Sequence, residues 1–440
     1  MRALYIVAFC FFFIPVVHGL EVIRDSEIEE TLYLIVDPIK KSANLPKLQI
    51  YIINDDNANA FTMFKDVIYI NSGLIVKYPN IDILRGVMAH EVGHIVGHHL
   101  VRQLSNIDSY KTFNFTTSIL GVLASVLVGD SNLAIAGYGL GEHIPVRAFL
   151  SHSRTNEYAA DQTALKLLEA SHCSCVGMIE LFESFSSLRD PKLINSYVQT
   201  HPLDQERISI IRDFCFNSKY RNAKNSDFLS YRLNRASAKL RAFTDNNPKS
   251  LLRGASKSYS KDIAKYVQSI CYFRMHDMKN SIAYINELIE SNPQDPFYNE
   301  LKAQILFEFG NANSINFYDI ASNFRPNDEL IELSRAIVGI TIYSNKAELK
   351  PFKTVLDKII LQNPDNILSL QYLAIYYGKI GANAKAQLTS AIIYSKTGEL
   401  KKAKLFAKYA IKKLKKDSSA WYKANDIILM KDDQVKDIDN

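Results

Sequence analysis

The sequence predicts an α+β domain followed by an all-α region of helical repeats, and two observations support this division. Up to about residue 225 the chain mixes β-branched runs with helix-like periodicity, a pattern typical of α+β domains. Beyond that point nearly all segments have helical composition, punctuated by Asn-Pro and Arg-Pro pairs. A chain of 440 residues is long enough for two or three domains with their own cores.

The first domain contains two strand-like runs and two helix-like segments. Residues 47–53 and 67–70 are rich in β-branched and aromatic side chains, so both are expected to be strands. A helix is expected at about 82–103, with Asp82 as its N-cap, and another at about 154–169.

Between these helices lies a strongly apolar stretch at 115–128, which Asp130 and a glycine-rich segment at 137–141 close quickly. It is short for a membrane span, so a buried or lid-like hairpin is the simpler expectation. Peripheral membrane contact through 115–141 is the alternative.

The N-terminus has the pattern of a secretory signal. Arg2 precedes an apolar stretch at 3–17, and residues 17–19 have the pattern of a signal-peptide cleavage site with small residues. We therefore expect residues 1–19 to be a cleaved signal peptide and the protein to be exported. An uncleaved anchor is the alternative interpretation.

Loss of the signal leaves four cysteines, Cys173, Cys175, Cys215 and Cys271. Cysteines separated by one residue seldom pair with each other, so Cys173 or Cys175 is expected to pair with Cys215 or Cys271. Four unpaired, buried thiols are the alternative. The Cys-x-Cys spacing does not match common zinc ribbons, so we expect no metal ligand among them.

The formal net charge of +6 has a local origin. Nine lysines and one acid, Glu399, lie between Lys396 and Lys416. A basic stripe of this kind is most often a solvated helix face, and an anionic membrane or partner is the alternative. Because the N-terminus indicates export, we expect no nucleic-acid partner.

The segment His90–His94 (His-Glu-Val-Gly-His) has the spacing of a catalytic zinc motif. In a helix, His90 and His94 lie one turn apart on the same face and can bind one ion. Glu91 lies roughly 100° around the axis, where it can act on the attacking water instead of ligating. The motif predicts a zinc peptidase with one Zn²⁺ per chain.

The third ligand of a catalytic zinc site distinguishes the peptidase classes. Metzincins would place a histidine where this chain has Leu100, so that class is excluded. His98 is a minor alternative, because ligands at three successive turns would diverge around the helix. His99 is expected to face another way.

Glu157, on the second expected helix, is the preferred third ligand. Asp161 lies four residues later on the same helix face. From there it can hydrogen-bond a ligand imidazole and fix its tautomer.

The second half of the chain shows a repeat. Residues 272–276 align with 306–310 at an offset of 34, and Pro293 and Pro326 close two units 33 residues apart. The segment 385–416 reads as a further helix-turn-helix with small residues at packing positions. This is the tetratricopeptide (TPR) period in degenerate form, and such TPR-like solenoids commonly bind other polypeptides on a concave face.

These motifs together resemble the HtpX/BepA kind of gluzincin metallopeptidases. The likeness rests on His90–His94 and on 153–161 (Ser-Arg-Thr-Asn-Glu-Tyr-Ala-Ala-Asp). Residues 59–61 with 68–75 are similar to the family's edge strand, and 200–207 resembles its downstream His-Pro…Arg element. An exported peptidase followed by TPR-like repeats resembles the BepA (YfgC-type) periplasmic group, and the likeness covers almost the whole mature chain.

The resemblance implies a zincin-like metallopeptidase domain at 20–225, after the signal peptide at 1–19, and a TPR-like helical repeat domain at 226–440. One departure is visible: Thr62–Asp66 stands where the family often has a Pro-Gly-Gly turn. This changes the turn beside the expected substrate strand.

The resemblance also implies roles for further residues. Glu91 would be the general base, and His201 and Arg207 are candidates to stabilise the developing oxyanion. A histidine such as His201 is also a candidate to occupy the zinc's open position and hold the enzyme latent. Substrate would add as a strand along the edge formed by Asn59, Ala60 and Phe61.

Two functions fit these expectations. The first is a periplasmic zinc endopeptidase that cleaves misfolded or stalled envelope proteins during outer-membrane β-barrel assembly, with the repeats recruiting substrates or the assembly machinery. The alternative is a TPR-based chaperone or scaffold whose peptidase is mostly latent. A purely structural zinc is disfavoured, since structural sites are usually closed by four, typically Cys-rich, ligands.

Overall fold

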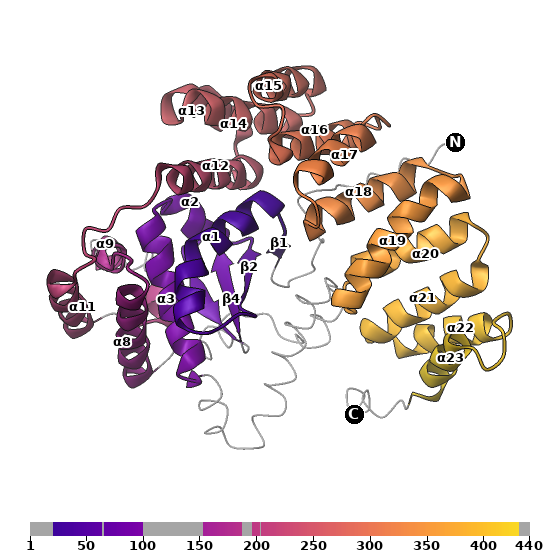
Figure 1. Cartoon of the computed structure of the whole chain (residues 1–440), viewed down its shortest axis with the longest axis horizontal. Coiled ribbons are helices and arrows are strands. Elements are labelled where there is room, and N and C mark those ends of the chain that lie inside the picture. The colour runs from indigo at the N-terminus through magenta and orange to yellow at the C-terminus, as the bar shows by residue number, and fades with distance from the viewer. Residues whose placement is uncertain (1–20, 64–65, 100–152, 187–195, 203, 431–440) are drawn as a thin grey trace.

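The structure, a computed structural model, describes residues 21–63, 66–99, 153–186, 196–202 and 204–430. The expected signal peptide at 1–19 and the expected hairpin at 115–128 lie outside the described residues, as does the proposed membrane contact at 115–141. The described part is mostly helical with one small sheet, consistent with a peptidase domain followed by a helical C-terminal region (Figure 1).

The sheet has four strands in the order β1-β2-β4-β3. Their bounds are Val22–Ile23, Gln49–Ile53, Ala60–Thr62 and Val67–Asn71 for β1 to β4. The two predicted strands are therefore confirmed as β2 and β4, which pair in parallel. The short strand β3 pairs with β4 in antiparallel fashion, and among the described residues no other strand lies beside it, so it is an edge of the described sheet.

Three helices of the first part surround this sheet, namely α1 (Ser26–Ser42), α2 (Ser72–Lys77) and α3 (Ile81–Val96). Helix α3 is buried along almost its whole length, because the sheet, α8 (Arg154–Ala170) and α9 (Val176–Ser186) all pack around it. The predicted helix at 154–169 is confirmed as α8.

Helix α3 begins within one residue of the predicted start, but its predicted N-cap and its predicted C-terminal end were wrong. Its N-cap is Asn80, whose side chain accepts hydrogen bonds from the backbone N–H groups of Asp82 and Ile83, and Asp82 itself lies in the first turn. The helix ends at Val96, with Gly97 as its C-cap and His98 in the left-handed region at φ +50°. The chain thus turns off the helix axis directly after the motif.

Two further helices of the described first part are α10 (Ser196–Thr200) and α11 (Gln205–Asn217). A disulfide joins Cys175 to Cys215, which confirms one of the predicted pairings. Cys173 and Cys271 are buried free thiols.

The remaining described chain consists of helices in sequence, each packed on its neighbours (Figure 1). They are α12 (Asp227–Thr244), α13 (Pro248–Ser258), α14 (Lys261–Arg274), α15 (Met278–Ser291), α16 (Pro296–Glu308), α17 (Ser314–Phe324), α18 (Glu329–Ile342), α19 (Lys346–Gln362), α20 (Ile367–Lys379), α21 (Asn383–Lys396), α22 (Leu400–Ile411) and α23 (Ser419–Leu429). In Figure 1 they form an arc that begins above the N-terminal part and descends to its right. Among the described helices, none is both long and apolar enough to cross a lipid bilayer.

The largest apolar core does not stop where the helical region begins. One cluster of buried side chains runs from Ile23 in β1 through the sheet and α3 to Ile305 in α16. The helices further along the arc have their own clusters of buried apolar side chains. The first helices of the arc are therefore packed as part of the N-terminal core.

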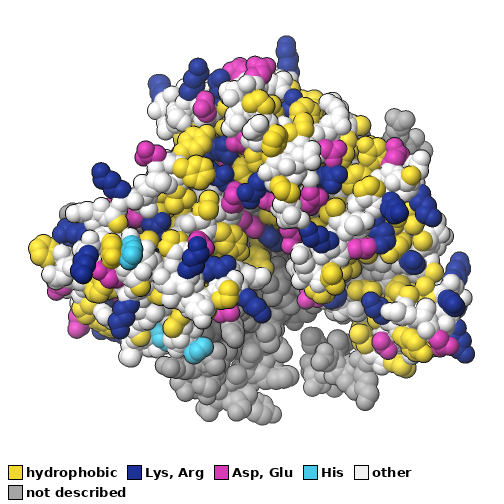
Figure 2. Space-filling model, viewed as in Figure 1, with side chains coloured by type: hydrophobic (Ala, Val, Ile, Leu, Met, Phe, Trp, Pro, Cys, Tyr) yellow, Lys and Arg dark blue, Asp and Glu magenta, His cyan; other side chains and the backbone are white. Residues whose placement is uncertain are grey.

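A buried ion cluster reinforces this junction. Glu27 in the first turn of α1 pairs with Arg235 and Lys239 of α12, and accepts a hydrogen bond of 2.9 Å from the hydroxyl of Tyr266. Arg235 also pairs with Asp295 at 2.6 Å. Figure 2 shows acidic and basic side chains gathered where the two parts meet. Burial opposes ionisation of Glu27, but the cations outweigh it and lower the pKa to about 2.

Replacing Glu27 with Gln should destabilise the protein by about 3–5 kcal/mol, because Arg235 and Lys239 would stay buried without their shared counter-charge. Chemical denaturation measures this loss. The Glu27 carboxylate has a depressed folded-state pKa, so its contribution is full above pH 4.5 and is lost as the pH falls toward about 2. The control is Glu183→Gln, which breaks the exposed pair with Arg212 and should cost about 1 kcal/mol at most. Equal losses in the two variants would contradict this account.

Candidate metal centre

Helix α3 brings His90, Glu91 and His94 into the interior, where all three side chains are buried. Gly93 lies between them in sequence and faces α8. A Cβ atom at this position would lie 2.6 Å from the carbonyl oxygen of Ala160. The glycine therefore allows the two helices to approach closely, and this places the α8 carboxylates next to the α3 imidazoles.

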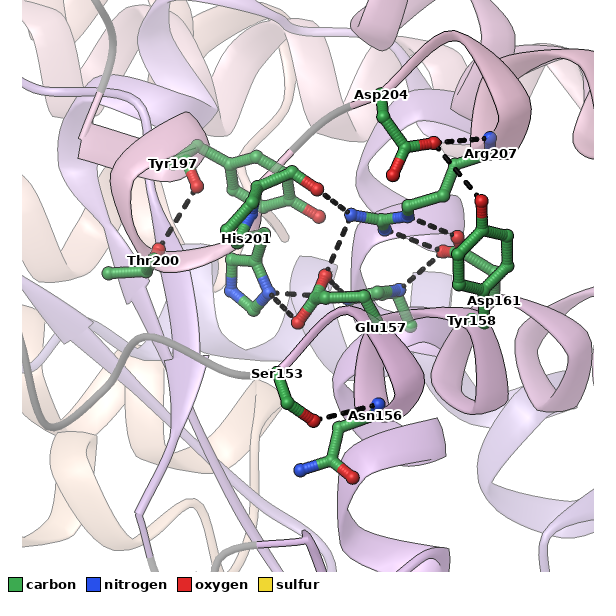
Figure 3. A network of polar contacts seen from close by, with 12 residues as sticks. Ser153, Asn156, Glu157, Tyr158, Asp161, Tyr197, Thr200, His201, Asp204 and Arg207 are labelled. Carbon is green, nitrogen blue, oxygen red and sulfur yellow. Dashed lines mark hydrogen bonds and ion pairs between the residues drawn. The ribbon is translucent and has the colours of Figure 1, made fainter.

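Helix α8 contributes Glu157 and Asp161, both buried. Ser153 caps the helix by accepting from the backbone N–H of Asn156, which places Glu157 in the first turn (Figure 3). The pair lies on one face at a spacing of four residues, as predicted.

The third segment is the connection after α10 together with the start of α11, which supply His201 and Arg207 respectively. Asp204 caps α11 by accepting from the Arg207 backbone N–H at 2.8 Å. Figure 3 shows the His201 ring and the Arg207 guanidinium both directed toward Glu157.

Four of these side chains converge on one point. Within the described residues, His90, His94, Glu157 and His201 each offer a ligand atom, and these atoms all lie within 4.8 Å of one another. Nε2 of His90 lies 3.1 Å from Nε2 of His94 and 3.3 Å from Nδ1 of His201. Oε1 of Glu157 lies 3.2 Å from Nε2 of His94 and 3.1 Å from Nδ1 of His201.

These spacings fit a tetrahedral zinc site. A regular tetrahedron with zinc–ligand bonds of about 2.0–2.1 Å has edges of about 3.3–3.4 Å. The four separations of 3.1–3.3 Å given above are close to that value, so the donor set fits Zn²⁺.

The outward nitrogens of the two motif histidines strengthen this conclusion. Nδ1 of His90 is 2.8 Å from Oδ1 of Asp161, so it carries the proton. Nδ1 of His94 is 2.9 Å from Nδ1 of His99. With both Nδ1 atoms engaged, the two Nε2 lone pairs face each other, an arrangement that a bound cation stabilises.

The charges around the centre also favour a cation. Burial lowers the pKa of His90, but the Glu157 charge and hydrogen bonds to Asp161 and Glu157 outweigh it and raise the pKa to about 10. Burial raises the pKa of Glu157, yet His201 and His90 hold it well below its usual value. The centre is therefore an anionic pocket for a positive charge.

Glu91 lies beside the ligand group and outside it. Its carboxylate oxygens are buried without a well-formed hydrogen bond among the described residues. Burial raises the pKa of Glu91 above its usual value, while His201, His90 and the backbone N–H of Thr62 act in the opposite direction. The raised pKa favours acceptance of a proton by this carboxylate.

Arg207, a candidate oxyanion donor in the sequence analysis, contacts both carboxylates of α8. Its guanidinium pairs with Asp161 through Nε at 2.7 Å and Nη2 at 3.0 Å. Its Nη1 lies 2.9 Å from Oε2 of Glu157 and donates to the carbonyl of Pro202 at 2.6 Å. Arg207 thus braces both carboxylates and the turn that carries His201.

The expected substrate edge lies on the same side of the site as His201. Asn59 and Phe61 belong to the segment that leads into and forms β3, and Ala60 accepts a hydrogen bond of 3.2 Å from Nε2 of His201. The Asn59 side chain accepts from Thr200 at 3.3 Å. The edge strand and the histidine turn are therefore in direct contact.

The two histidines after the motif differ in how they match the sequence analysis, which disfavoured His98 as a ligand and expected His99 to face away. His98 is exposed and does not join the ligand group. His99 was expected to face away, but it is buried against His94. That expectation was wrong because it extended the helix to residue 103, whereas the chain turns at Gly97.

Comparison with known proteins gives a consistent assignment. Residues 25–214 match peptidase family M48. This part of the chain is a peptidase family M48 domain. Its His-His-Glu-His group is consistent with a gluzincin metalloprotease.

Several curated proteases are similar to the chain at modest identity. The beta-barrel assembly-enhancing protease of Yersinia pestis is 23% identical over 265 residues, which cover 58% of this chain and 53% of that protein. The protein of the same name from Escherichia coli K12 is 27% identical over 173 residues, covering 37% and 33%. A Protease HtpX homolog of Acaryochloris marina is 28% identical over 159 residues, covering 31% and 50%. The chain thus spans about half the length, or less, of these curated relatives.

Gly93→Ala should weaken zinc binding roughly 10- to 100-fold, because the new methyl group forces α8 and its Glu157 away from the α3 imidazoles. Competition against a chromophoric chelator measures the affinity. Gly254→Ala is the matched control, since a Cβ there meets nothing within 4 Å. Unchanged affinity in the Gly93 variant would show that helix approach does not set the site.

Proposed function

We propose that the protein is a zinc-dependent endopeptidase whose own His201 holds it latent. The supporting observation is the filled ligand set: three expected ligands converge with a fourth from the α10–α11 turn, and the Glu91 carboxylate lies beside them. When bound, Zn²⁺ lowers the pKa of an attacking water and polarises the scissile carbonyl.

The residues of the chain would then perform the remaining steps. Glu91 accepts a proton from the attacking water on its carboxylate and later delivers it to the leaving amine. Asp161 fixes the His90 tautomer through the 2.8 Å hydrogen bond at Nδ1. Arg207 holds Asp161 and Glu157 in place, so we propose a positioning role for it.

The edge strand β3 offers the substrate a backbone partner. The carbonyl of Asn59 accepts from the backbone N–H of Asn71 in β4 at 2.9 Å. Because backbone groups alternate along an antiparallel strand, those of Ala60 face away from β4. A substrate segment would pair with them, which gives broad tolerance of substrate sequence.

His201 competes with the substrate at two points at once. Its Nδ1 fills the fourth ligand position, 3.3 Å from Nε2 of His90. Its Nε2 contacts the outward carbonyl of Ala60 at 3.2 Å and lies 3.4 Å from Glu91. Activation would require the α10–α11 turn to withdraw from both positions.

We place the protein in the periplasm, with the helical region as a TPR-like solenoid that engages unfolded substrates and the outer-membrane β-barrel assembly machinery. The expected signal peptide at 1–19 and the names of the similar assembly-enhancing proteases support this setting. We divide the chain at about residue 225 into a metallopeptidase domain and this recruiting domain.

Glu91→Gln should abolish cleavage of an unfolded outer-membrane protein, by about 10²-fold or more, because it removes the proton acceptor. Its zinc content should stay at the wild-type level, since Glu91 lies outside the ligand group. Gel-based cleavage assays and metal analysis provide the two readouts. Wild-type cleavage by this variant would contradict the enzyme proposal and favour the chaperone or scaffold alternative.

His201→Ala should raise cleavage, on the order of 10-fold, because it frees the fourth position and the Ala60 edge together. The double variant His201→Ala/Glu91→Gln should show no cleavage, which would assign the gain to this site. If His201→Ala binds zinc and cleaves more slowly than wild type, His201 acts as a transition-state donor and the latch is refuted.

A further inference from the structure

The two motif histidines receive different supports at their outward nitrogens. His90 meets the carboxylate of Asp161, which Arg207 braces in turn. His94 meets a second imidazole, that of His99, with 2.9 Å between the two Nδ1 atoms. The ring centroids of His94 and His99 lie 5.0 Å apart at an angle of 81°.

The chain reaches this arrangement through a turn built for it. Helix α3 ends at Val96, and the backbone N–H groups of Gly97 and His98 return to the carbonyls of Gly93 and Ile95 at 2.9 and 3.1 Å. His98 then adopts φ +50°, which turns the next residue back toward the helix. His98 is exposed as a result, and His99 keeps only 2% of its surface.

Gly97 leaves the space in which the His99 ring lies. A Cβ atom at Gly97 would be 2.3 Å from Nε2 of His99 and within 2.8 Å of two of its ring carbons. The Gly97 backbone itself has φ −73°, which any residue can adopt. The glycine is therefore required for the ring and not for the turn.

We infer that His99 is a positioning residue that fixes the tautomer and orientation of His94 for metal binding. Nε2 of His94 faces the other ligand atoms, so its proton lies on Nδ1 and is donated to Nδ1 of His99. His99 accepts in its neutral form, with its own proton on Nε2. The site thus binds its cation with a charged support behind one imidazole and a neutral support behind the other.

This inference rests on the proposed metal centre, and two substitutions at residue 99 separate an acceptor from a packing role. Asn places a carbonyl oxygen close to where Nδ1 of His99 lies, whereas Phe keeps the ring and removes the acceptor. If His99 positions His94 by hydrogen bonding, His99→Phe should weaken Zn²⁺ binding about 10- to 100-fold, and His99→Asn should stay within about 3-fold of wild type. Gly97→Ala should behave like His99→Phe, because it displaces the ring.

The measurement is Zn²⁺ affinity by chelator competition on the full chain, with His98→Asn as the control for the same turn. His98 is exposed, and Asn tolerates its left-handed backbone, so this control should match wild type. The reverse order, with Phe retaining affinity and Asn losing it, would overturn the inference, as would wild-type affinity in every variant. If the wild-type chain binds zinc without cleaving any polypeptide while the predicted order holds, the proposed function fails and the positioning role stands.

Discussion

The site depends on one constraint: four electron-pair donors from three separate segments meet in a buried space and need a cation between them. Three of the donors contact a supporting side chain, His90 that of Asp161, His94 that of His99, and Glu157 that of Arg207. The fourth, His201, contacts the backbone carbonyl of Ala60 through Nε2. Because these supports are themselves buried, the donors cannot turn away to solvent.

The close approach of α3 and α8 at Gly93 follows from the same constraint, since any larger residue would separate the imidazoles from the carboxylate. The α10–α11 turn is held against the site in the same way, because Arg207 contacts both Asp161 and the carbonyl of Pro202.

The same geometry connects metal binding to substrate access. His201 bridges from the ligand group to the outward carbonyl of Ala60, so in the proposed enzyme a single side chain closes both the fourth ligand position and the edge of the sheet. If His201 left only the fourth ligand position, the Ala60 edge would stay closed to substrate. If it left only the Ala60 edge, the fourth ligand position would stay occupied. The helical region is joined to the N-terminal part through Glu27 and α12. A partner bound to the first of these helices would therefore contact elements that share the apolar core of the N-terminal part.

Local patterns in the sequence predicted the parts of the site that depend on helix periodicity, namely the His90 and His94 pair, and Glu157 with Asp161 one turn later. The strands β2 and β4 were also predictable from their β-branched and aromatic runs, and one cysteine pairing from the spacing of the cysteines, which limits the possible pairings.

What could not be predicted depended on where helices end and on contacts distant in sequence. Asn80 and Asp82 are both good caps two residues apart, and the structure selects Asn80. Gly97 was the available signal for the end of α3, and without it His99 was assigned to the wrong side. Arg207 lies 46 residues from Asp161, so its bracing role emerges only from the folded chain.

X-ray absorption at the zinc edge tests the central claim most directly, because it reports the atoms around the metal in the intact protein. The account predicts four nitrogen or oxygen neighbours at about 2.0–2.1 Å, with outer-shell scattering from three imidazoles and no sulfur. Scattering from only two imidazoles would contradict the claim that His201 fills the fourth position. A sulfur neighbour, or the absence of stoichiometric zinc, would contradict the metal centre itself.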